Sequence, residues 1–317
     1  MHDVSGSSAY GVAAVKSALS LLVAPLALFA SPAAAQMAQT LETDLRPSES
    51  TSSHTPAVSA LGRVSVTAGA RFVSEYISRG IAFSDKPSLQ PSVTMRIALP
   101  ELTNGAVTNV SVFAGNWNSM QFDDPGLGQQ SSGSLRGWYE ADLYAGVSMK
   151  LGDSVAISGT YFRYVSPSNS FRGYNDLEFI VSYDDSALWS GGAANVGFSL
   201  APALRMVQEA GRPGRKDALY IQPSLTPSLR VGGHSSKVRA SVPLVLGLSD
   251  HYYRDAAGKD ETVGFFRTGL TLAGSDFVGV PGLTATTGVD LWLLNDRVAN
   301  GLDDIEVVGR AGFSMAL

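Results

Sequence analysis

Hydrophobic and polar residues alternate with a period of two over most of this chain. In the segment 138–151, Tyr139, Leu143 and Val147 fall on one face, and Glu140 and Asp142 fall on the other. Successive side chains of a β-strand point to opposite sides of a sheet, so this pattern predicts a strand with one apolar and one polar face. Similar segments recur from residue 62 to residue 317, separated by clusters of glycine, asparagine, aspartate, proline and serine.

The alternating segments predict twelve strands. They cover 62–74, 88–100, 106–118, 137–150, 154–165, 174–184, 194–206, 218–231, 237–248, 263–273, 283–294 and 305–317. Tilted strands of about 11 residues can cross a bilayer, and a single-chain bacterial barrel has an even number of them. Connections after odd-numbered strands are mostly longer, as expected of outer loops opposed to periplasmic turns. We therefore predict an all-β fold, a transmembrane antiparallel up-and-down β-barrel of about 12 strands over residues 61–317.

A soluble β-sandwich is the alternative source of alternating strands. Its strands usually have about five or six residues, which is shorter than the segments found here. The predicted outward faces are nearly free of charge, whereas charged residues collect on the other face or between strands. This distribution favours a barrel surrounded by lipid.

The N-terminal region predicts export. Lys16 precedes the apolar stretch 18–30, and Ala33-Ala34-Ala35 fits a signal-peptide cleavage site, so we assign residues 1–35 to a signal peptide. Residues 36–60, rich in serine, threonine, proline and alanine, predict a flexible periplasmic leader. We expect a bacterial outer-membrane location, contact with outer-membrane lipid, and contact with the barrel-assembly machinery during insertion.

Composition excludes little else. The chain has no cysteine, which a barrel closed by its own hydrogen-bond ladder does not need. A formal net charge of −5 gives no sign of a nucleic-acid partner. Of the four histidines, His2, His54, His234 and His251, only His251 falls where a Ser–His pair could act on lipid at the membrane rim. We expect no enzyme activity and no cofactor, with a membrane-embedded lipid-modifying enzyme as the less favoured alternative.

The polar faces carry charges of both signs. The predicted pore-lining residues are Arg71, Arg96, Glu140, Asp142, Asp176, Glu178, Arg205, Arg230, Arg239, Arg267, Asp290 and Arg310. An acidic wall that faces a basic wall would create a transverse field across a pore. Alternatively, these charges pair with their neighbours, as Arg205 could with Glu178, and fill the lumen.

Several short motifs resemble those of a known family. The first has an S-x-Y-x-x-R-G pattern and reads Ser74-Glu75-Tyr76-Ile77-Ser78-Arg79-Gly80-Ile81. Four further motifs follow it along the chain: Asp85-Lys86-Pro87-Ser88-Leu89-Gln90, Phe113-Ala114-Gly115-Asn116-Trp117, Tyr139-Glu140-Ala141-Asp142-Leu143-Tyr144-Ala145-Gly146 and Tyr174-Asn175-Asp176-Leu177-Glu178. Together they resemble the TorF-like family of proteobacterial porins, formerly the Gcw_chp group, over residues 68 to 183. The motif residues are Ser74, Tyr76, Arg79 and Gly80. The resemblance implies an outer-membrane barrel with a porin role, and it supplies no substrate and no catalytic residue.

These observations favour a porin-like channel for passive diffusion of small hydrophilic solutes or ions. Barrels of eight strands are filled by side chains and barrels of sixteen leave an aqueous channel, so about twelve strands allow either state. A non-conducting barrel with a structural or surface-display role is the alternative. The sequence leaves the oligomeric state open.

If Arg71, Arg205 and Arg267 shape ion selectivity, reversing their charge should move the preference of the pore toward cations. The reversal potential of single channels under a salt gradient measures this preference. Unchanged reversal potentials in the three variants would contradict this selectivity role.

Overall fold

A computed structural model describes residues 62–123, 135–233, 235–255, 257–298 and 303–317. The predicted signal peptide and leader, together with His2, His54 and His234, lie outside the described residues. Among the residues that the structure describes, no helix is long and apolar enough to cross a membrane.

Strands make up most of the described chain. The strands are β1 (Val64–Val73), β2 (Tyr76–Ser78), β3 (Ile81–Ser84), β4 (Ser88–Ala98), β5 (Val107–Gln121), β6 (Trp138–Leu151), β7 (Val155–Val165), β8 (Tyr174–Tyr183), β9 (Ala203–Ala210), β10 (Leu219–Leu225), β11 (Ser228–Arg230), β12 (Val238–Ser241), β13 (Leu244–Arg254), β14 (Asp260–Ser275), β15 (Leu283–Leu294) and β16 (Ile305–Ala316). The short helices are η1 (Pro100–Leu102), η2 (Ser186–Leu188), α2 (Gly191–Asn195) and η3 (Phe277–Gly279).

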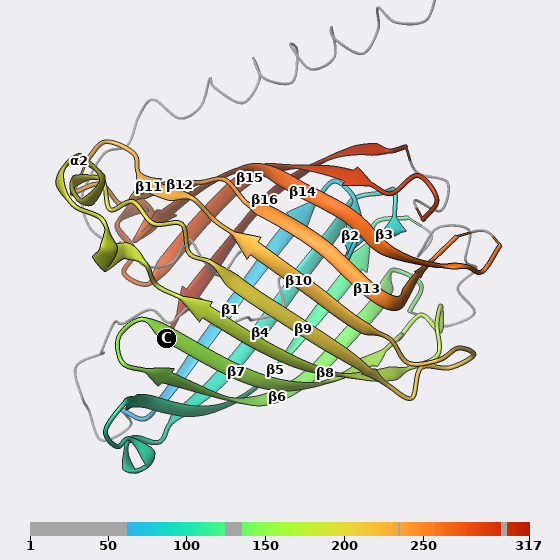
Figure 1. The fold of residues 1–317 in the computed structure, drawn as a ribbon, viewed down its shortest axis with the longest axis horizontal. Coiled ribbons are helices and arrows are strands. Elements are labelled where there is room, and N and C mark those ends of the chain that lie inside the picture. The colour runs from blue at the N-terminus through green and yellow to red at the C-terminus, as the bar shows by residue number, and fades with distance from the viewer. Residues whose placement is uncertain (1–61, 124–134, 234, 256, 299–302) are drawn as a thin grey trace, which may run out of the picture. The chain divides into compact units, whose positions relative to one another are not determined.

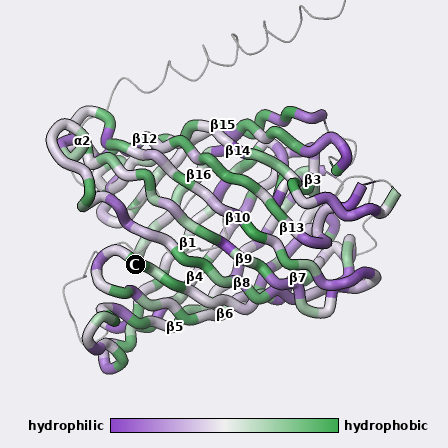
Figure 2. The backbone as a smooth tube through the Cα atoms, in the orientation of Figure 1, coloured by the Kyte–Doolittle hydropathy of each residue, from purple (hydrophilic) through white to green (hydrophobic). Residues whose placement is uncertain are grey.

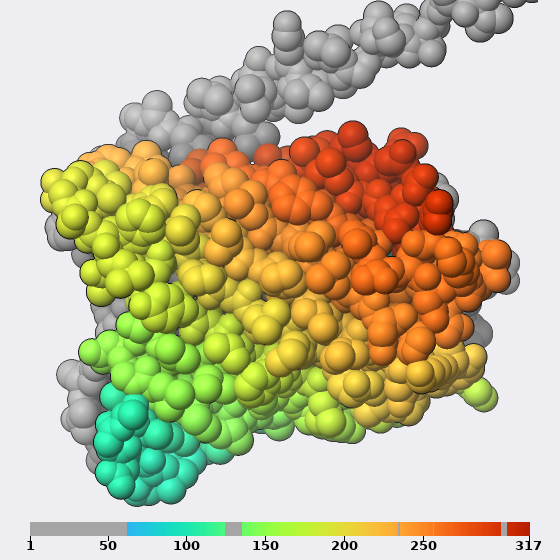
Figure 3. Space-filling model, viewed as in Figure 1, coloured from blue at the N-terminus to red at the C-terminus, as the bar shows by residue number. Residues whose placement is uncertain are grey.

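All strands except β2 and β3 form one antiparallel sheet that closes on itself (Figure 1). The first strand β1 pairs with the last strand β16, from Thr67 opposite Ala316 to Val73 opposite Arg310. The sheet has 14 strands, but β10 and β11 lie end to end in one position of the wall, and β12 and β13 lie end to end in the next. The wall therefore has twelve strand positions. The side of the wall that faces the viewer forms a continuous surface in the space-filling view (Figure 3). The predicted twelve-stranded antiparallel barrel is confirmed.

The outer surface of the wall is apolar. Large hydrophobic side chains point outward from each part of the wall, with exposed fractions of 53% for Leu143, 53% for Leu177 and 59% for Phe313. Hydrophilic residues gather instead in the loops at the end of the barrel that carries β3 and the β13–β14 turn (Figure 2). Exposed leucine and phenylalanine over the whole wall are what a hydrocarbon environment requires.

The predicted strand 194–206 is wrong in its first half. Residues 191–195 form the helix α2, and the strand β9 begins only at Ala203. Ala201 adopts a left-handed φ of 47°, and Pro202 has no N–H to donate to a ladder, so the strand cannot extend further back. The connection between β8, which ends at Tyr183, and β9 is therefore longer than the predicted connection 185–193.

Tyr139 does not occupy the outward face that strict alternation predicts. The register between β5 and β6 shifts at this point, because Ser119 faces Glu140 while Met120 faces Trp138. The extra residue of this bulge turns Tyr139 inward, where only 2% of it is exposed, beside the inward-facing Glu140. The bulge adds a large aromatic side chain to the lumen.

The predicted first outer loop, 75–87, contains a small hairpin. β2 and β3 pair with each other and with no other strand of the described residues. This hairpin, residues 76–84, lies at the end of the barrel opposite the C-terminus (Figure 1). Its residues are mostly buried, so it is packed into the barrel and does not project into solvent.

The substitution Val147→Arg tests the outward face of β6, where Val147 is 46% exposed and its cross-strand neighbours are Val112 and Gly159. A charge placed at mid-bilayer on the lipid face should lower the free energy of unfolding by about 2–4 kcal/mol. Denaturant unfolding of the protein in lipid vesicles measures the change. Val147→Ala, which shortens the side chain without adding charge, is the matched control. Equal losses in the two variants would show that this face does not meet hydrocarbon.

Candidate functional site

The turn of the hairpin is formed by Arg79 and Gly80, with left-handed φ values of 51° and 74°. Two consecutive residues with positive φ form the type I′ turn that suits the twist of a two-stranded hairpin. Gly80 is required for a second reason. A Cβ at this position would collide with the ring of Phe265, which projects from the wall strand β14. The tip of the hairpin therefore fits closely against the barrel wall.

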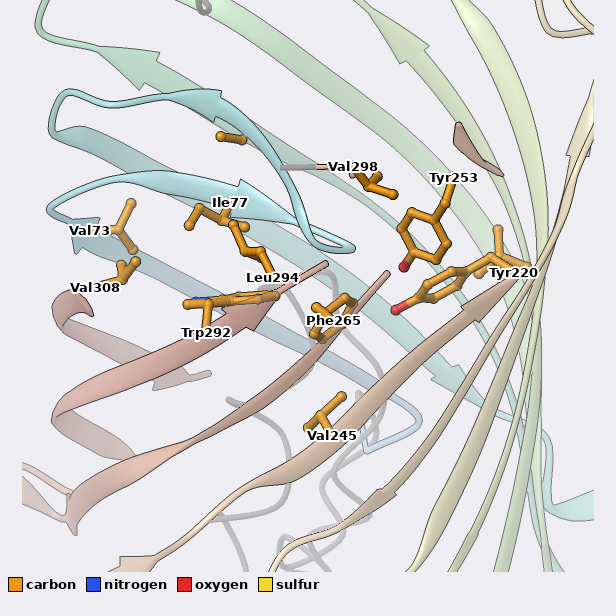
Figure 4. Packing of buried hydrophobic residues seen from close by; sticks show 12 residues of the cluster. Val73, Ile77, Tyr220, Val245, Tyr253, Phe265, Trp292, Leu294, Val298 and Val308 are labelled. Atoms are coloured by element: carbon orange, nitrogen blue, oxygen red, sulfur yellow. The ribbon is translucent and has the colours of Figure 1, made fainter. Parts of the chain in front are cut away.

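The two sides of the hairpin pack against opposite parts of the wall. Ile77 and Ala82 belong to a buried cluster that includes Tyr253, Phe265 and Trp292. Figure 4 shows Ile77 beside Leu294 and Trp292, with Tyr253 and Tyr220 further along the cluster.

On its other side, Tyr76 belongs to a buried aromatic cluster with Trp117 and Tyr139, against which Phe83 packs. The ring centroids of Tyr76 and Trp117 are 5.6 Å apart, and those of Tyr76 and Phe83 are 5.4 Å apart. The hairpin thus connects β5 and β6 on one side with β13, β14 and β15 on the other, across the outer half of the lumen.

Arg79 anchors the tip of the hairpin. Its Nη2 atom lies 2.7 Å from Oδ2 of Asp176 and donates to the hydroxyl of Tyr164 at 3.2 Å. The side chains of Arg79 and Asp176 are 3% and 0% exposed. The guanidinium carbon also lies 5.5 Å from the ring centre of Tyr220 and 5.6 Å from that of Tyr252. A buried charge needs such partners, because desolvation alone would make burial very unfavourable.

The other residues of the S-x-Y-x-x-R-G motif also hold the hairpin in place. The Tyr76 hydroxyl donates to Glu140 at 3.0 Å. Ser74 pairs with Gly309 of β16, since its N–H donates to the Gly309 carbonyl and its Oγ accepts from the Gly309 N–H, both at 2.9 Å. The Tyr253 hydroxyl donates to the backbone carbonyl of Arg79 at 2.9 Å. Each motif residue therefore has a structural contact that positions the hairpin.

Among the predicted pore-lining residues, several charges are paired inside the barrel. Arg205 Nε lies 2.6 Å from Glu178 Oε2, and both side chains are 3% exposed. Asp290 Oδ1 accepts a hydrogen bond from Arg310 Nη2 at 3.0 Å, and Asp290 Oδ2 lies 3.5 Å from Arg267 Nη1. These pairs match the alternative in which the inward charges neutralise their neighbours, and they weaken the transverse field expected of separate acidic and basic walls.

The remaining predicted residues lie elsewhere along the barrel. Arg71 donates to Gln90 at 3.3 Å, and Arg96 donates to Ser111 at 2.8 Å and to Ser148 at 3.1 Å. Asp142 is fully buried on the inner face of β6.

Arg230 on β11 and Arg239 on β12 lie opposite each other in the sheet. The Nη1 and Nη2 atoms of Arg239 both donate to the Gly197 carbonyl, at 2.8 Å and 2.9 Å. The structure therefore does not bring the twelve predicted residues into one constellation.

The other end of the lumen is less filled. Ser65 and Thr67 point inward from β1 and are exposed, whereas Val73, further along the same face, is 3% exposed. Hydroxyl groups that face solvent there can hydrogen-bond water. The lumen thus changes from a packed outer half to a wetter inner part.

Glu209 is an inward-facing charge that the sequence pattern missed. It is 2% exposed and lies 2.6 Å from Arg215 and 3.7 Å from Arg212, both in the loop after β9. A strand predicted at 194–206 ends before Glu209. The correct bounds would have placed Arg205, Val207 and Glu209 on one alternating face.

His251 lies in β13 at the outer rim, not in a loop as predicted. Its Nδ1 atom is 2.7 Å from Asp260 Oδ2, and its Nε2 atom is 2.7 Å from Lys216 Nζ. Both ring nitrogens are thus already engaged, and neither contact is with a serine hydroxyl. Among the described residues, no group of three or more histidines, aspartates or glutamates is placed to hold a metal ion.

Glu75 lies at the base of the hairpin, just after β1. The pKa of Glu75 is raised from 4.5 to about 7, mainly by burial and also by the nearby carboxylates of Glu306 and Asp85, while Lys86 lowers it. The point at which the chain leaves the wall therefore carries a carboxyl group that changes charge near neutral pH.

No protein-family model matches the sequence, and no curated protein matches it. Among solved structures, the chain is similar to the transport unit of the autotransporter AIDA-I from Escherichia coli, with 10% identity, a TM-score of 0.41, and coverage of 87% of this chain and 95% of that chain. LpxR from Salmonella typhimurium has 9% identity and a TM-score of 0.41 over 78% of this chain and 99% of that chain. The translocator domain of the autotransporter NalP from Neisseria meningitidis has 14% identity and a TM-score of 0.38 over 83% and 90%.

These likenesses concern the barrel fold alone. The class of the protein follows from its own structure, in which a closed antiparallel sheet carries an apolar outer face. The protein is a transmembrane β-barrel of the kind found in outer membranes.

The raised pKa of Glu75 predicts a pH dependence of stability. Between pH 4.5 and about 7 the folded protein keeps a proton that the unfolded chain releases, so this contribution to stability is present at low pH and is lost as the pH rises through about 7. The thermal unfolding midpoint should fall across this range in the wild type. Glu75→Gln, which cannot ionise, should lose this part of the pH dependence. An unchanged pH profile in Glu75→Gln would contradict the assignment.

Proposed function

We propose that this protein is an outer-membrane channel for small hydrophilic solutes that is closed, in the conformation described, by its first outer loop. The observation that carries this proposal is the hairpin packed across the outer half of the lumen, with Arg79 buried against Asp176. The exposed Ser65 and Thr67 at the other end support an aqueous entrance from that side. The resemblance of the hairpin motif to TorF-like porins agrees with this role and stays a prediction.

A hairpin is a suitable closing element because it can move without disturbing the wall. In the part of the chain that the structure describes, β2 and β3 pair only with each other, so no hydrogen bond between wall strands breaks when they leave. The contacts that hold the tip are side-chain contacts and one bond to the Arg79 carbonyl. Opening would therefore expose the hairpin and leave the barrel intact.

The same packing supports a second candidate, a non-conducting barrel with a structural or surface-display role. Hairpin and wall share two buried clusters, and the inward charges near them are paired. A permanent plug would have the same contacts. We assign no catalytic residue in either case.

Single-channel recording of Arg79→Ala in planar bilayers distinguishes the two candidates. Removing one partner of a buried ion pair costs about 3–5 kcal/mol, so the ratio of closed to open channels should fall by roughly two to four orders of magnitude. We expect rare openings in the wild type and frequent, discrete openings in Arg79→Ala.

Arg205→Ala is the matched control, because it also removes a buried arginine from a carboxylate, and both partners of this pair belong to wall strands. Its channels should stay mostly closed. Silence from Arg79→Ala protein that is heat-modifiable, and hence folded, would favour the non-conducting barrel. Steady conductance of the wild type equal to that of Arg79→Ala would show that the hairpin does not close the pore.

A further inference from the structure

The groups around the Arg79 guanidinium form a site of their own, which we call the Arg79 seat: Tyr164, Asp176, Tyr220 and Tyr252. They supply a buried carboxylate, a hydroxyl acceptor and two aromatic rings within 6 Å of the cation. Carboxylates and aromatic faces together are the groups that bind planar organic cations in proteins.

Every member of the Arg79 seat comes from the barrel wall and not from the hairpin. Tyr164 lies on β7, Asp176 on β8, Tyr220 on β10 and Tyr252 on β13. Tyr164 is fixed by stacking on Phe162 and on Tyr174, with ring centroids 6.0 Å and 4.4 Å apart. Cross-strand pairing holds Tyr164, Asp176 and Tyr220 in the wall. The Tyr252 N–H donates to Ser249 Oγ of the same strand at 2.8 Å. The site therefore persists when the hairpin leaves.

Arg79 does not use the full capacity of the seat. It contacts Asp176 through Nη2 and Oδ2 only, while Oδ1 of Asp176 and Nε of Arg79 are buried and have no hydrogen-bond partner among the described residues. The backbone of the turn restrains how the guanidinium can approach. A free guanidinium compound has no such restraint, so it can place two parallel N–H groups against both carboxylate oxygens.

The seat also favours a guanidinium group over an ammonium group. A planar guanidinium is weakly hydrated and stacks on aromatic rings, whereas an ammonium is a compact, strongly hydrated charge. With Asp176 and Tyr164 buried, an ammonium would lose more hydration for fewer directed hydrogen bonds.

We propose that the Arg79 seat is a binding site for alkylguanidinium cations, that Arg79 occupies it as an internal ligand, and that a free alkylguanidinium compound competes with the hairpin for it. The binding site is inferred from the positions of wall residues alone. That its occupation would open the channel rests on the proposed function.

Ethylguanidinium and ethylammonium chloride, at equal millimolar concentrations, test the site in the Arg79→Ala variant. Ethylguanidinium should raise the thermal unfolding midpoint of this variant, with an affinity about tenfold above that of ethylammonium because of the paired hydrogen bonds. The double variant Arg79→Ala/Asp176→Asn should lose the effect. Equal stabilisation by both compounds, or persistence of the effect without the Asp176 carboxylate, would overturn the proposal.

A second measurement needs neither Arg79→Ala nor conduction. The chain has no cysteine, so Ser78→Cys places a single thiol on the hairpin, where the serine is 2% exposed. Ethylguanidinium should displace Arg79 and increase the rate at which a soluble maleimide labels this thiol, and ethylammonium should not. A labelling rate that ethylguanidinium leaves unchanged would count against competition.

The two proposals can fail separately. If ethylguanidinium binds and releases the hairpin while every variant is electrically silent, the guanidinium site stands and the channel does not. If Arg79→Ala conducts while ethylguanidinium neither binds it nor accelerates labelling, the channel stands and the guanidinium site is wrong.

Discussion

The pairing of β1 with β16 is the constraint on which the rest of this structure depends. A sheet in hydrocarbon cannot leave an edge with free N–H and C=O groups, so the ends of the sheet must meet. Here they meet in register from Thr67 to Val73, and Ser74 continues the pairing through Gly309. Closure fixes a lumen of twelve strand positions, which is narrow enough for side chains and one hairpin to fill its outer half.

Within that lumen, charge is accommodated by local pairing. Glu178 and Asp290 are matched by arginines of the wall, whereas the partner of Asp176 comes from the hairpin. The ion pairs of Glu178 and Asp290 join two wall residues, so they do not depend on the position of a loop. The ion pair between Asp176 and Arg79 exists only when the hairpin is docked. One buried carboxylate thereby connects the conformation of a loop to the electrostatics of the lumen.

The sequence pattern predicted the barrel well because a lipid-facing wall imposes a strict period of two. It failed where local geometry overrides the period, at the Pro202 break before β9 and at the bulge that turns Tyr139 inward. The candidate site was harder to predict. Asp176 and Glu178 were assigned to the lumen, but Arg79 falls in a predicted loop, and no periodicity shows that a loop folds back into a barrel. The motif around Arg79 marked the segment without indicating its contacts.

The hairpin also constrains the order in which the molecule can assemble. Its tip is bound by the Tyr253 hydroxyl, which lies 174 residues further along the chain, and its base is bound by Gly309, which lies 235 residues beyond Ser74. Tyr253 and Gly309 reach these positions only when the last strands have joined the wall. The hairpin therefore docks late in folding, after the ring of strands is complete, because contacts between residues far apart in the sequence form slowly. A barrel arrested before its final strands insert would lack the Gly309 contacts at the base of the hairpin, so the hairpin would be held by fewer bonds than in the finished molecule.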